Sequence, residues 1–250
     1  MLYSDIEFVN NSVVQGSRLS KSWAQEQHIY FYAEFSKAFR ENGISVDDTL
    51  YKGMQSAEGN NIKAYVKFCT EENEEIFVRI AISAVSIKGA KKNFDAEINE
   101  RSFDEVKIDA ENIWEKELSK IDVEGGTKEQ KTIFYTALYH SFTAPNLFQD
   151  VDGKYRGTDL KVHQSEGHTN YTVFSLWDTY RATHPLYTII QQNRTNDFIT
   201  FANSIFSTTA SKTFRRLEAL YKGLQTACSS ICSLFSKPTI VSSSSLYVSA

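Results

Sequence analysis

The stretch that decides the fold is HIYFYAEFS, residues 28–36. Its Ile, Phe, Ala and Phe residues alternate with Tyr, Tyr, Glu and Ser, the period of two that indicates a β-strand with one buried face. Residues 62–68 and 76–83 repeat this alternation, and turn-forming segments separate the strands. The pattern predicts an antiparallel β-sandwich over residues 1–95. The face expected to be buried in the last strand consists of Ile76, Val78, Ile80 and Ile82.

Further along the chain the hydrophobic period changes from two to 3.6, which indicates helices. Ser102 and Glu105 form a capping box, and the apolar residues that follow as far as Leu118 have helical spacing. A second helix is predicted to begin at Thr127 and to end before Pro145, because proline cannot continue a helix. We therefore expect a mainly helical region after the sandwich.

A loop and hairpin are expected within residues 146–170, and helix again from about Ser175. This region carries three polar motifs: PNLFQDVDGKYRG at 145–157, KVH at 161–163 and SLWDTYR at 175–181. Carbohydrate sites use such a mixture, because an aromatic face covers the C–H surface of a sugar while carboxylates and guanidinium groups bind its hydroxyls. The motifs therefore suggest the lining of a polar-ligand pocket.

Trp177, Asp178 and Arg181 are the candidate binding residues of this region. On one helix, Asp178 and Arg181 would be spaced i, i+3 and Trp177 and Arg181 i, i+4, so that all three could face one rim. The alternative is a surface Asp–Arg pair beside a tryptophan of the core, which would contribute little. The residues alone leave both interpretations open.

Two features resemble metal sites, and both have a simpler interpretation. Residues 150–153, DVDG, begin like a calcium loop, but Lys161 stands where an EF-hand needs a bidentate glutamate. A tight hairpin turn, with Asp152 and Gly153 in positive-φ conformations, is predicted instead. Four histidines have spacings that match no tight ligand pair, and we expect them to be hydrogen-bonded separately: His140, His163, His168 and His184.

The order of the motifs adds a family resemblance. DVDGKYRG, KVH and SLWDTYR, preceded by SKSWA at 20–24, YFYAEFS at 30–36 and IKGAKKN at 87–93, resemble the calcium-dependent α-mannosidases of glycoside hydrolase family 92. The resemblance extends over roughly residues 1 to 200. It implies an α+β fold: an N-terminal antiparallel β-sandwich, a linking helix and an (α/α)6 catalytic barrel, of which this chain would contain the first helices.

The resemblance also implies a division of the chain. Residues 1–95 would be part of the sandwich domain, 96–126 the linking helix, and 127–200 the start of the catalytic domain. Residues 201–250 form an atypical Ser-rich tail, which has no Asp or Glu after Glu218. Either the tail is a disordered or atypical C-terminus, or it is the out-of-frame end of a truncated gene product.

Family membership would give the candidate residues roles. Asp178 would accept hydrogen bonds from mannose hydroxyls, Arg181 would hold that carboxylate in place, and Trp177 would form a wall of the pocket. The resemblance implies an inverting hydrolysis of α-1,2-mannosidic linkages in N-glycans or mannans, helped by calcium. It places the catalytic acid and base, and most calcium ligands, beyond the WDTYR motif, so we expect no catalytic or metal-ligating residue here and an inactive fragment.

Composition gives no support for other classes of partner. A net charge of −4 gives no reason to expect nucleic acid or an anionic membrane, and no apolar stretch is long enough to span a bilayer. The N-terminal residues show no signal peptide, whereas the family resemblance implies a periplasmic or extracellular location.

Three functional hypotheses follow. The first is an α-mannosidase fragment, whose partner would be a mannose-containing glycan. The second is a non-catalytic carbohydrate-binding remnant. The third is a sandwich-type interaction module unrelated to sugars, in which Trp177 would be fully buried.

Overall fold

The computed structural model describes residues 2–22, 24–172, 175–208 and 247–248. The chain divides into two compact units, which are considered separately below. Unit 1 contains Met1–Val106 and Gln149–Ser165, and unit 2 contains Lys107–Phe148 and Glu166–Ala250. Among the described helices, none combines the length and hydropathy needed to cross a bilayer.

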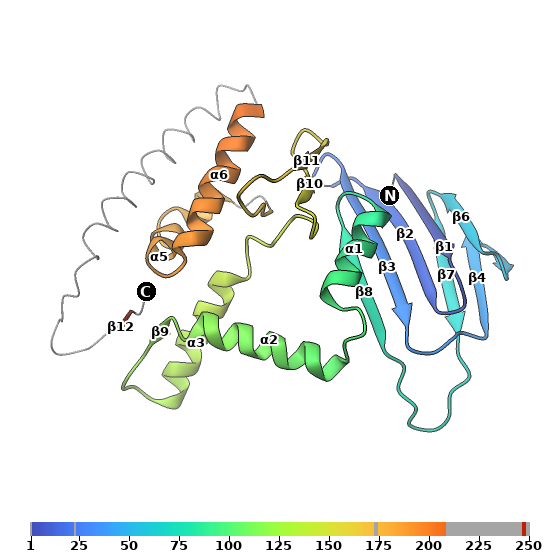
Figure 1. The fold of residues 1–250 in the computed structure, drawn as a ribbon, viewed down its shortest axis with the longest axis horizontal. Helices are drawn as coiled ribbons and strands as arrows, with labels where there is room; N and C mark the ends of the chain where they lie inside the picture. The colour runs from blue at the N-terminus through green and yellow to red at the C-terminus, as the bar shows by residue number, and fades with distance from the viewer. Residues whose placement is uncertain (1, 23, 173–174, 209–246, 249–250) are drawn as a thin grey trace. The chain divides into compact units, whose positions relative to one another are not determined.

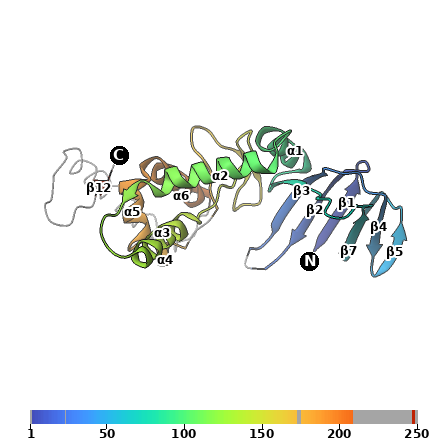
Figure 2. The same cartoon turned by 90° about the horizontal axis from the view of Figure 1, so that it is seen from below.

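Unit 1 is built on two antiparallel sheets (Figure 1), as the alternating pattern predicted. The larger sheet has the strand order β6-β1-β2-β3-β8. Its strands are β1 (Tyr3–Phe8), β2 (Val13–Ser20), β3 (Gln27–Phe35), β6 (Ser56–Gly59) and β8 (Val78–Ser83). In the smaller sheet β4 lies between β5 and β7 (Figure 2). These strands are β4 (Glu41–Val46), β5 (Thr49–Lys52) and β7 (Ile62–Lys67).

The core between the two sheets is aromatic and aliphatic. Phe8 and Val14 from the larger sheet pack with Ile44 from the smaller one and with Phe39 from the connection between them. The rings of Phe8 and Phe39 meet edge to face, with centroids 5.6 Å apart. Burial of these side chains drives the two sheets together.

A helix that the sequence interpretation did not predict covers the opposite face of the larger sheet. It is α1 (Ile87–Glu97), which lies along β3 and β8 (Figure 1). Its N-cap is Ser86, whose hydroxyl accepts a hydrogen bond from Gly89 N at 3.0 Å. Ala90 and Phe94 pack on Tyr32 of the sheet. The interior strand β3 is therefore covered on both faces.

The expected buried face of β8 was wrong. Ala81 and Ser83 are the buried residues of this strand, whereas Ile80 and Ile82 are 57% and 63% exposed. The reason is that α1 covers the Ala81 side, while the core between the two sheets contains no residue of β8. An alternating pattern identifies a strand but not which of its faces a neighbouring element will cover.

The DVDGKYRG motif folds into unit 1. Asp150 N donates to Lys154 O and Gly153 N donates to Asp150 O, each at 2.8 Å, which forms the predicted tight turn. Gly153 has a φ of 80°, whereas Asp152 does not have a positive φ. The following strands are β10 (Lys154–Arg156) and β11 (Val162–Gln164), which pair with each other. The strand that follows the turn therefore pairs with β11 and not with the residues that precede the turn, as a hairpin at Asp152 and Gly153 would require.

The turn is attached to the sandwich by a buried carboxylate. Asp150 is 2% exposed, and it accepts hydrogen bonds from Ser83 Oγ at 2.8 Å and Asn93 Nδ2 at 3.0 Å. Gly89 makes room for it, because a Cβ atom there would lie 2.1 Å from Asp150 Oδ2. The Arg156 guanidinium adds hydrogen bonds to the carbonyl oxygens of Ala84, Val85 and Leu160. IKGAKKN and DVDGKYRG are thus two halves of one packed structure.

Unit 2 is mainly helical, as the change of period predicted. Its helices are α2 (Phe103–Leu118, which begins in unit 1), α3 (Lys128–Phe142), α4 (Leu176–Thr179), α5 (Thr183–Ile190) and α6 (Gln192–Thr208). Short strands β9 (Ile121–Asp122) and β12 (Tyr247–Val248) pair antiparallel. Leu138 and Phe142 of α3 pack in one core with Tyr187 and Ile190 of α5 and Phe198 of α6.

Both predicted helices begin with a capping box, of which the sequence predicted the one at Ser102. Ser102 Oγ accepts from Glu105 N, and the Glu105 carboxylate accepts from Ser102 N. Thr127 and Gln130 form the same reciprocal pair at the start of α3. Each pair satisfies backbone donors that a helix terminus leaves without an intrahelical partner.

Replacing Asp150 by alanine should destabilise unit 1, because the buried Ser83 hydroxyl and Asn93 amide would lose their acceptor. We expect the free energy of unfolding to fall by about 2–4 kcal/mol in urea denaturation. The matched control is Asp152→Ala in the same turn, which removes partly exposed ion pairs and should cost less than about 1 kcal/mol. Equal effects of the two variants would contradict this account of the carboxylate.

Candidate functional site

The predicted binding residues lie on and after a very short helix. Trp177 and Asp178 belong to α4, which contains four residues, and Arg181 lies beyond its end in the turn before α5. The single helix expected to carry all three residues is therefore interrupted. Trp177 is 81% exposed, and Asp178 and Arg181 are exposed as well.

Arg181 is held by its neighbour rather than by Asp178. Its Nε donates to the Tyr180 hydroxyl at 2.7 Å, and its guanidinium lies 5.3 Å from the centre of the Tyr180 ring. Within the described part of the chain, no hydrogen bond or ion pair between Asp178 and Arg181 is present. The alternative of a surface Asp–Arg pair beside a core tryptophan does not fit, and neither does a fully buried Trp177.

A buried histidine supports the same segment. His184 Nε2 lies 2.9 Å from Thr179 Oγ1, and the side chain is 6% exposed among the aromatic rings of Tyr187 and Phe198. Burial lowers the pKa of His184, because the charged imidazolium is disfavoured away from water. The sequence alone predicted only that His184 is hydrogen-bonded separately from the other histidines, not that it contacts Thr179. His184, Tyr187 and Thr188 follow helical spacing, and this could have placed His184 on the buried face of α5.

The structure gives separate partners to two of the four predicted histidines, His163 and His184. His163 Nε2 lies 2.9 Å from Asp159 Oδ1 on the hairpin of unit 1, and this contact lowers the pKa of the Asp159 carboxyl. His184 contacts Thr179 in unit 2. The prediction that these histidines are hydrogen-bonded separately is confirmed for both.

The described residues do not provide a calcium site. No group of three or more His, Cys, Asp or Glu side chains in the described ranges is arranged to hold a metal ion. The Asp150 carboxylate is occupied by neutral donors, and Asp152 is paired with Lys92 at 2.8 Å and Lys154 at 3.3 Å. These lysines lower the pKa of the Asp152 carboxyl. Its charge is thus neutralised by lysines, so the DVDG turn does not fit calcium.

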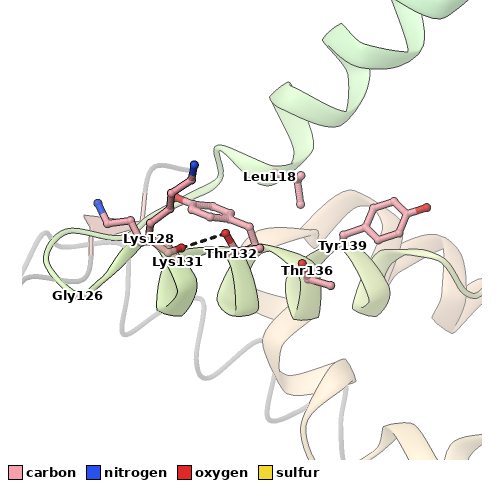
Figure 3. Close-up of a pocket in the computed structure, with 8 residues that line it drawn as sticks. Leu118, Gly126, Lys128, Lys131, Thr132, Thr136 and Tyr139 are labelled. Carbon is pink, nitrogen blue, oxygen red and sulfur yellow. Dashed lines mark hydrogen bonds between the residues drawn. The ribbon is translucent and has the colours of Figure 1, made fainter.

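A groove of about 710 Å³ lies within unit 2 between the end of α2 and one face of α3 (Figure 3). Lys128 and Lys131 extend along it, and the Thr132 hydroxyl donates to Lys128 O at 3.0 Å. The groove is lined by Leu118, Gly126, Lys128, Lys131, Thr132, Tyr135, Thr136 and Tyr139. Among the described residues, the lining includes no carboxylate and none of the three predicted binding residues, so these residues do not supply the groups of a glycosidase centre.

Comparison with known families identifies both parts of the chain. The Glycosyl hydrolase family 92 N-terminal domain matches residues 1–83, and the Glycosyl hydrolase family 92 catalytic domain matches residues 89–227. The chain therefore belongs to glycosyl hydrolase family 92. The catalytic-domain match continues past residue 200, where the sequence interpretation had placed the end of the resemblance, so it includes the first part of the proposed tail. Most of that tail lies outside the described residues.

Solved structures agree with this assignment. The chain is 38% identical to the family GH92 α-mannosidase BT3965 from Bacteroides thetaiotaomicron, with a TM-score of 0.79. The match covers 84% of this chain and 29% of that enzyme. The same enzyme has also been solved in complex with mannoimidazole. The inverting mannosidase BT2199 from the same species is 28% identical, with a TM-score of 0.74, over 80% of this chain and 28% of that chain.

The chain thus spans less than a third of the length of these solved relatives. A search of the curated proteins gave no match.

The stability of the chain should depend on pH through His184. The unfolded chain takes up a proton at this histidine as pH falls through about 6.5, whereas the folded chain resists protonation until a lower pH. The free energy of unfolding should therefore decrease as pH falls below that value. Its packing neighbours Tyr187 and Phe198 carry no charge in this range.

We expect His184→Gln to flatten this dependence between pH 7.5 and 5 in chemical denaturation. An unaltered slope in His184→Gln would contradict the assignment.

Proposed function

We propose that this chain is the sandwich and the first part of the catalytic domain of an α-mannosidase that acts on α-1,2-mannosidic linkages of N-glycans or mannans. The proposal is supported by the family, by a relative that is an α-mannosidase solved with mannoimidazole, and by a second relative that is an inverting mannosidase. A mannose-containing glycan is the proposed partner, and a periplasmic or extracellular location is the proposed compartment.

The observation that carries the proposal is that Trp177 and Asp178, which are consecutive residues of α4, are both exposed. A sugar presents C–H groups on one face and hydroxyls at its edge, so an indole ring and an adjacent carboxylate match both parts. Asp178 accepts hydrogen bonds from mannose hydroxyls, and Trp177 forms a wall of the site. The Tyr180–Arg181 pair, which follows α4 in the chain, would add a second planar surface and a cation.

We call the surface formed by Trp177, Asp178, Tyr180 and Arg181 the rim. Hydrolysis with inversion requires more groups than the rim contains. A carboxylic acid protonates the leaving oxygen while a carboxylate on the other face activates a water, with roughly 6.5–9.5 Å between the two groups. In our proposal these catalytic groups, and the ligands of the calcium ion that the family uses, are residues outside the described part of this chain. The described residues bind and orient the sugar.

The second candidate is carbohydrate binding without cleavage, and the same rim favours it for this chain on its own. The two candidates differ in a simple observable, because binding requires only the rim and turnover requires the acid and base. Two experiments separate them.

The first experiment tests binding. Asp178→Ala should weaken the affinity of this chain for methyl α-mannoside by about 1.5–3 kcal/mol in calorimetric titration, because a charge-assisted hydrogen bond is lost. The melting temperature should not change, since Asp178 is exposed. The control is Asp104→Ala, which removes another exposed carboxylate on α2. Unchanged affinity in Asp178→Ala would rule out the rim as the sugar site.

The second experiment tests turnover. The purified 250-residue chain should not hydrolyse aryl or disaccharide α-mannosides even with excess calcium, because the catalytic acid and base are absent from the proposed rim. Product release is measured with and without a chelator, and a solved full-length relative serves as positive control. Calcium-dependent turnover that the chelator abolishes would show that this chain carries the catalytic groups itself.

A further inference from the structure

The segment that presents Trp177 and Asp178 is too short to hold its own shape. α4 contains four residues, and an isolated helix of this length is unstable in water because the cost of nucleation exceeds the gain from its few hydrogen bonds. Its last residue is Thr179, whose backbone N donates a hydrogen bond to Ser175 O at 3.2 Å. A side chain from another element is therefore needed to fix it.

His184 supplies that contact from the following helix. It lies on the buried face of α5 with Tyr187, Thr188 and Ile190, and its ring meets the rings of Tyr187 and Phe198 edge-on, at 6.2 and 6.5 Å between centroids. Tyr187 is tied to the end of α3, because its hydroxyl donates to Ser141 O and also lies 3.3 Å from Ala144 O. The imidazole is thus part of the packed core of unit 2, and its position is not free to vary.

The hydrogen atoms around Thr179 can be assigned from its partners. The Thr179 hydroxyl lies 2.8 Å from Ser175 O and 2.9 Å from His184 Nε2, but it carries one hydrogen. A carbonyl oxygen can only accept, so the hydroxyl donates to Ser175 O and accepts from His184 Nε2–H. The neutral imidazole therefore carries its proton on Nε2, and Thr179 links the core to the backbone of α4 through two hydrogen bonds.

We propose that His184 is a positioning residue for sugar recognition: by donating from Nε2 to Thr179 Oγ1 it fixes α4, and with it Trp177 and Asp178, in the orientation that meets the sugar. This inference rests on the proposed function of the rim and adds the element that orders it. A rim ordered before the ligand arrives does not lose conformational freedom on binding, and this raises affinity without any new contact to the ligand.

Conservative variants test the hydrogen bond separately from packing. Thr179→Val has nearly the same shape but lacks the hydroxyl, and Thr179→Ser keeps it. Thr179→Val should weaken binding of methyl α-mannoside by about three- to tenfold, the effect of one hydrogen bond, while Thr179→Ser stays close to the wild-type affinity. His184→Gln retains an amide donor and should lose less affinity than His184→Leu.

A second readout does not depend on sugar binding. The chain is labelled with 5-fluorotryptophan, and the fluorine resonance of Trp177 is assigned from its loss in Trp177→Phe. This resonance should shift or broaden in Thr179→Val and remain in place in Thr179→Ser. The fluorine resonance of Trp114, which lies on α2, should be unaffected in both and shows that the core is intact.

The outcomes separate the two claims. Wild-type affinity and an unmoved Trp177 resonance in Thr179→Val would overturn the positioning role, as would equal losses in Thr179→Val and Thr179→Ser. If the wild-type chain binds no mannoside, the proposed function fails, and the fluorine comparison alone decides whether His184 and Thr179 order α4.

Discussion

The arrangement of unit 1 depends on the burial of one carboxylate. Transferring Asp150 from water costs free energy unless its oxygen atoms are hydrogen-bonded, and Ser83 and Asn93 provide those bonds. The close approach also requires Gly89, because any side chain at that position would collide with the carboxylate. One constraint thus links the end of β8, the start of α1 and the hairpin of residues 149–165. It explains why two motifs that are far apart in the sequence contain these residue types.

The packing around Asp150 also means that the boundary between the two compact units differs from the boundary between the two family domains. The family's N-terminal domain ends at residue 83 and its catalytic domain begins at residue 89, but α1 and the β10–β11 hairpin, which belong to the catalytic-domain match, pack on the sandwich in unit 1. The chain leaves the sandwich after Val106, forms α3, and returns to it at Gln149. A chain cut between residues 83 and 89 would therefore expose the Ala81 face of β8 and lose the partners of Asp150.

Local patterns predicted the elements better than their packing. Alternation located β3, β7 and β8, and the capping residues at Ser102 and Thr127 located α2 and α3, since these signals are contained in a few neighbouring residues. The helix α1 was missed, because its apolar stripe is narrow and its core contacts come from distant strands. For the same reason Ile80 and Ile82 were expected to be buried. At the candidate site, the sequence proposed Trp177, Asp178 and Arg181 as binding residues, and this stays a prediction. It did not predict the break after Thr179 or the contact of His184 with Thr179, because both depend on packing between distant residues.

The central functional claim is that α-mannosides bind at Trp177 and Asp178. The most direct measurement is a titration of the ¹⁵N-labelled chain with methyl α-mannoside, followed residue by residue in two-dimensional NMR spectra. The account predicts that shifts will concentrate at the Trp177 indole and at the backbone amides of Asp178 and Arg181, and that they will be lost in Asp178→Ala. Shifts confined to the groove around Lys128 and Lys131, or no shifts at millimolar sugar, would contradict it.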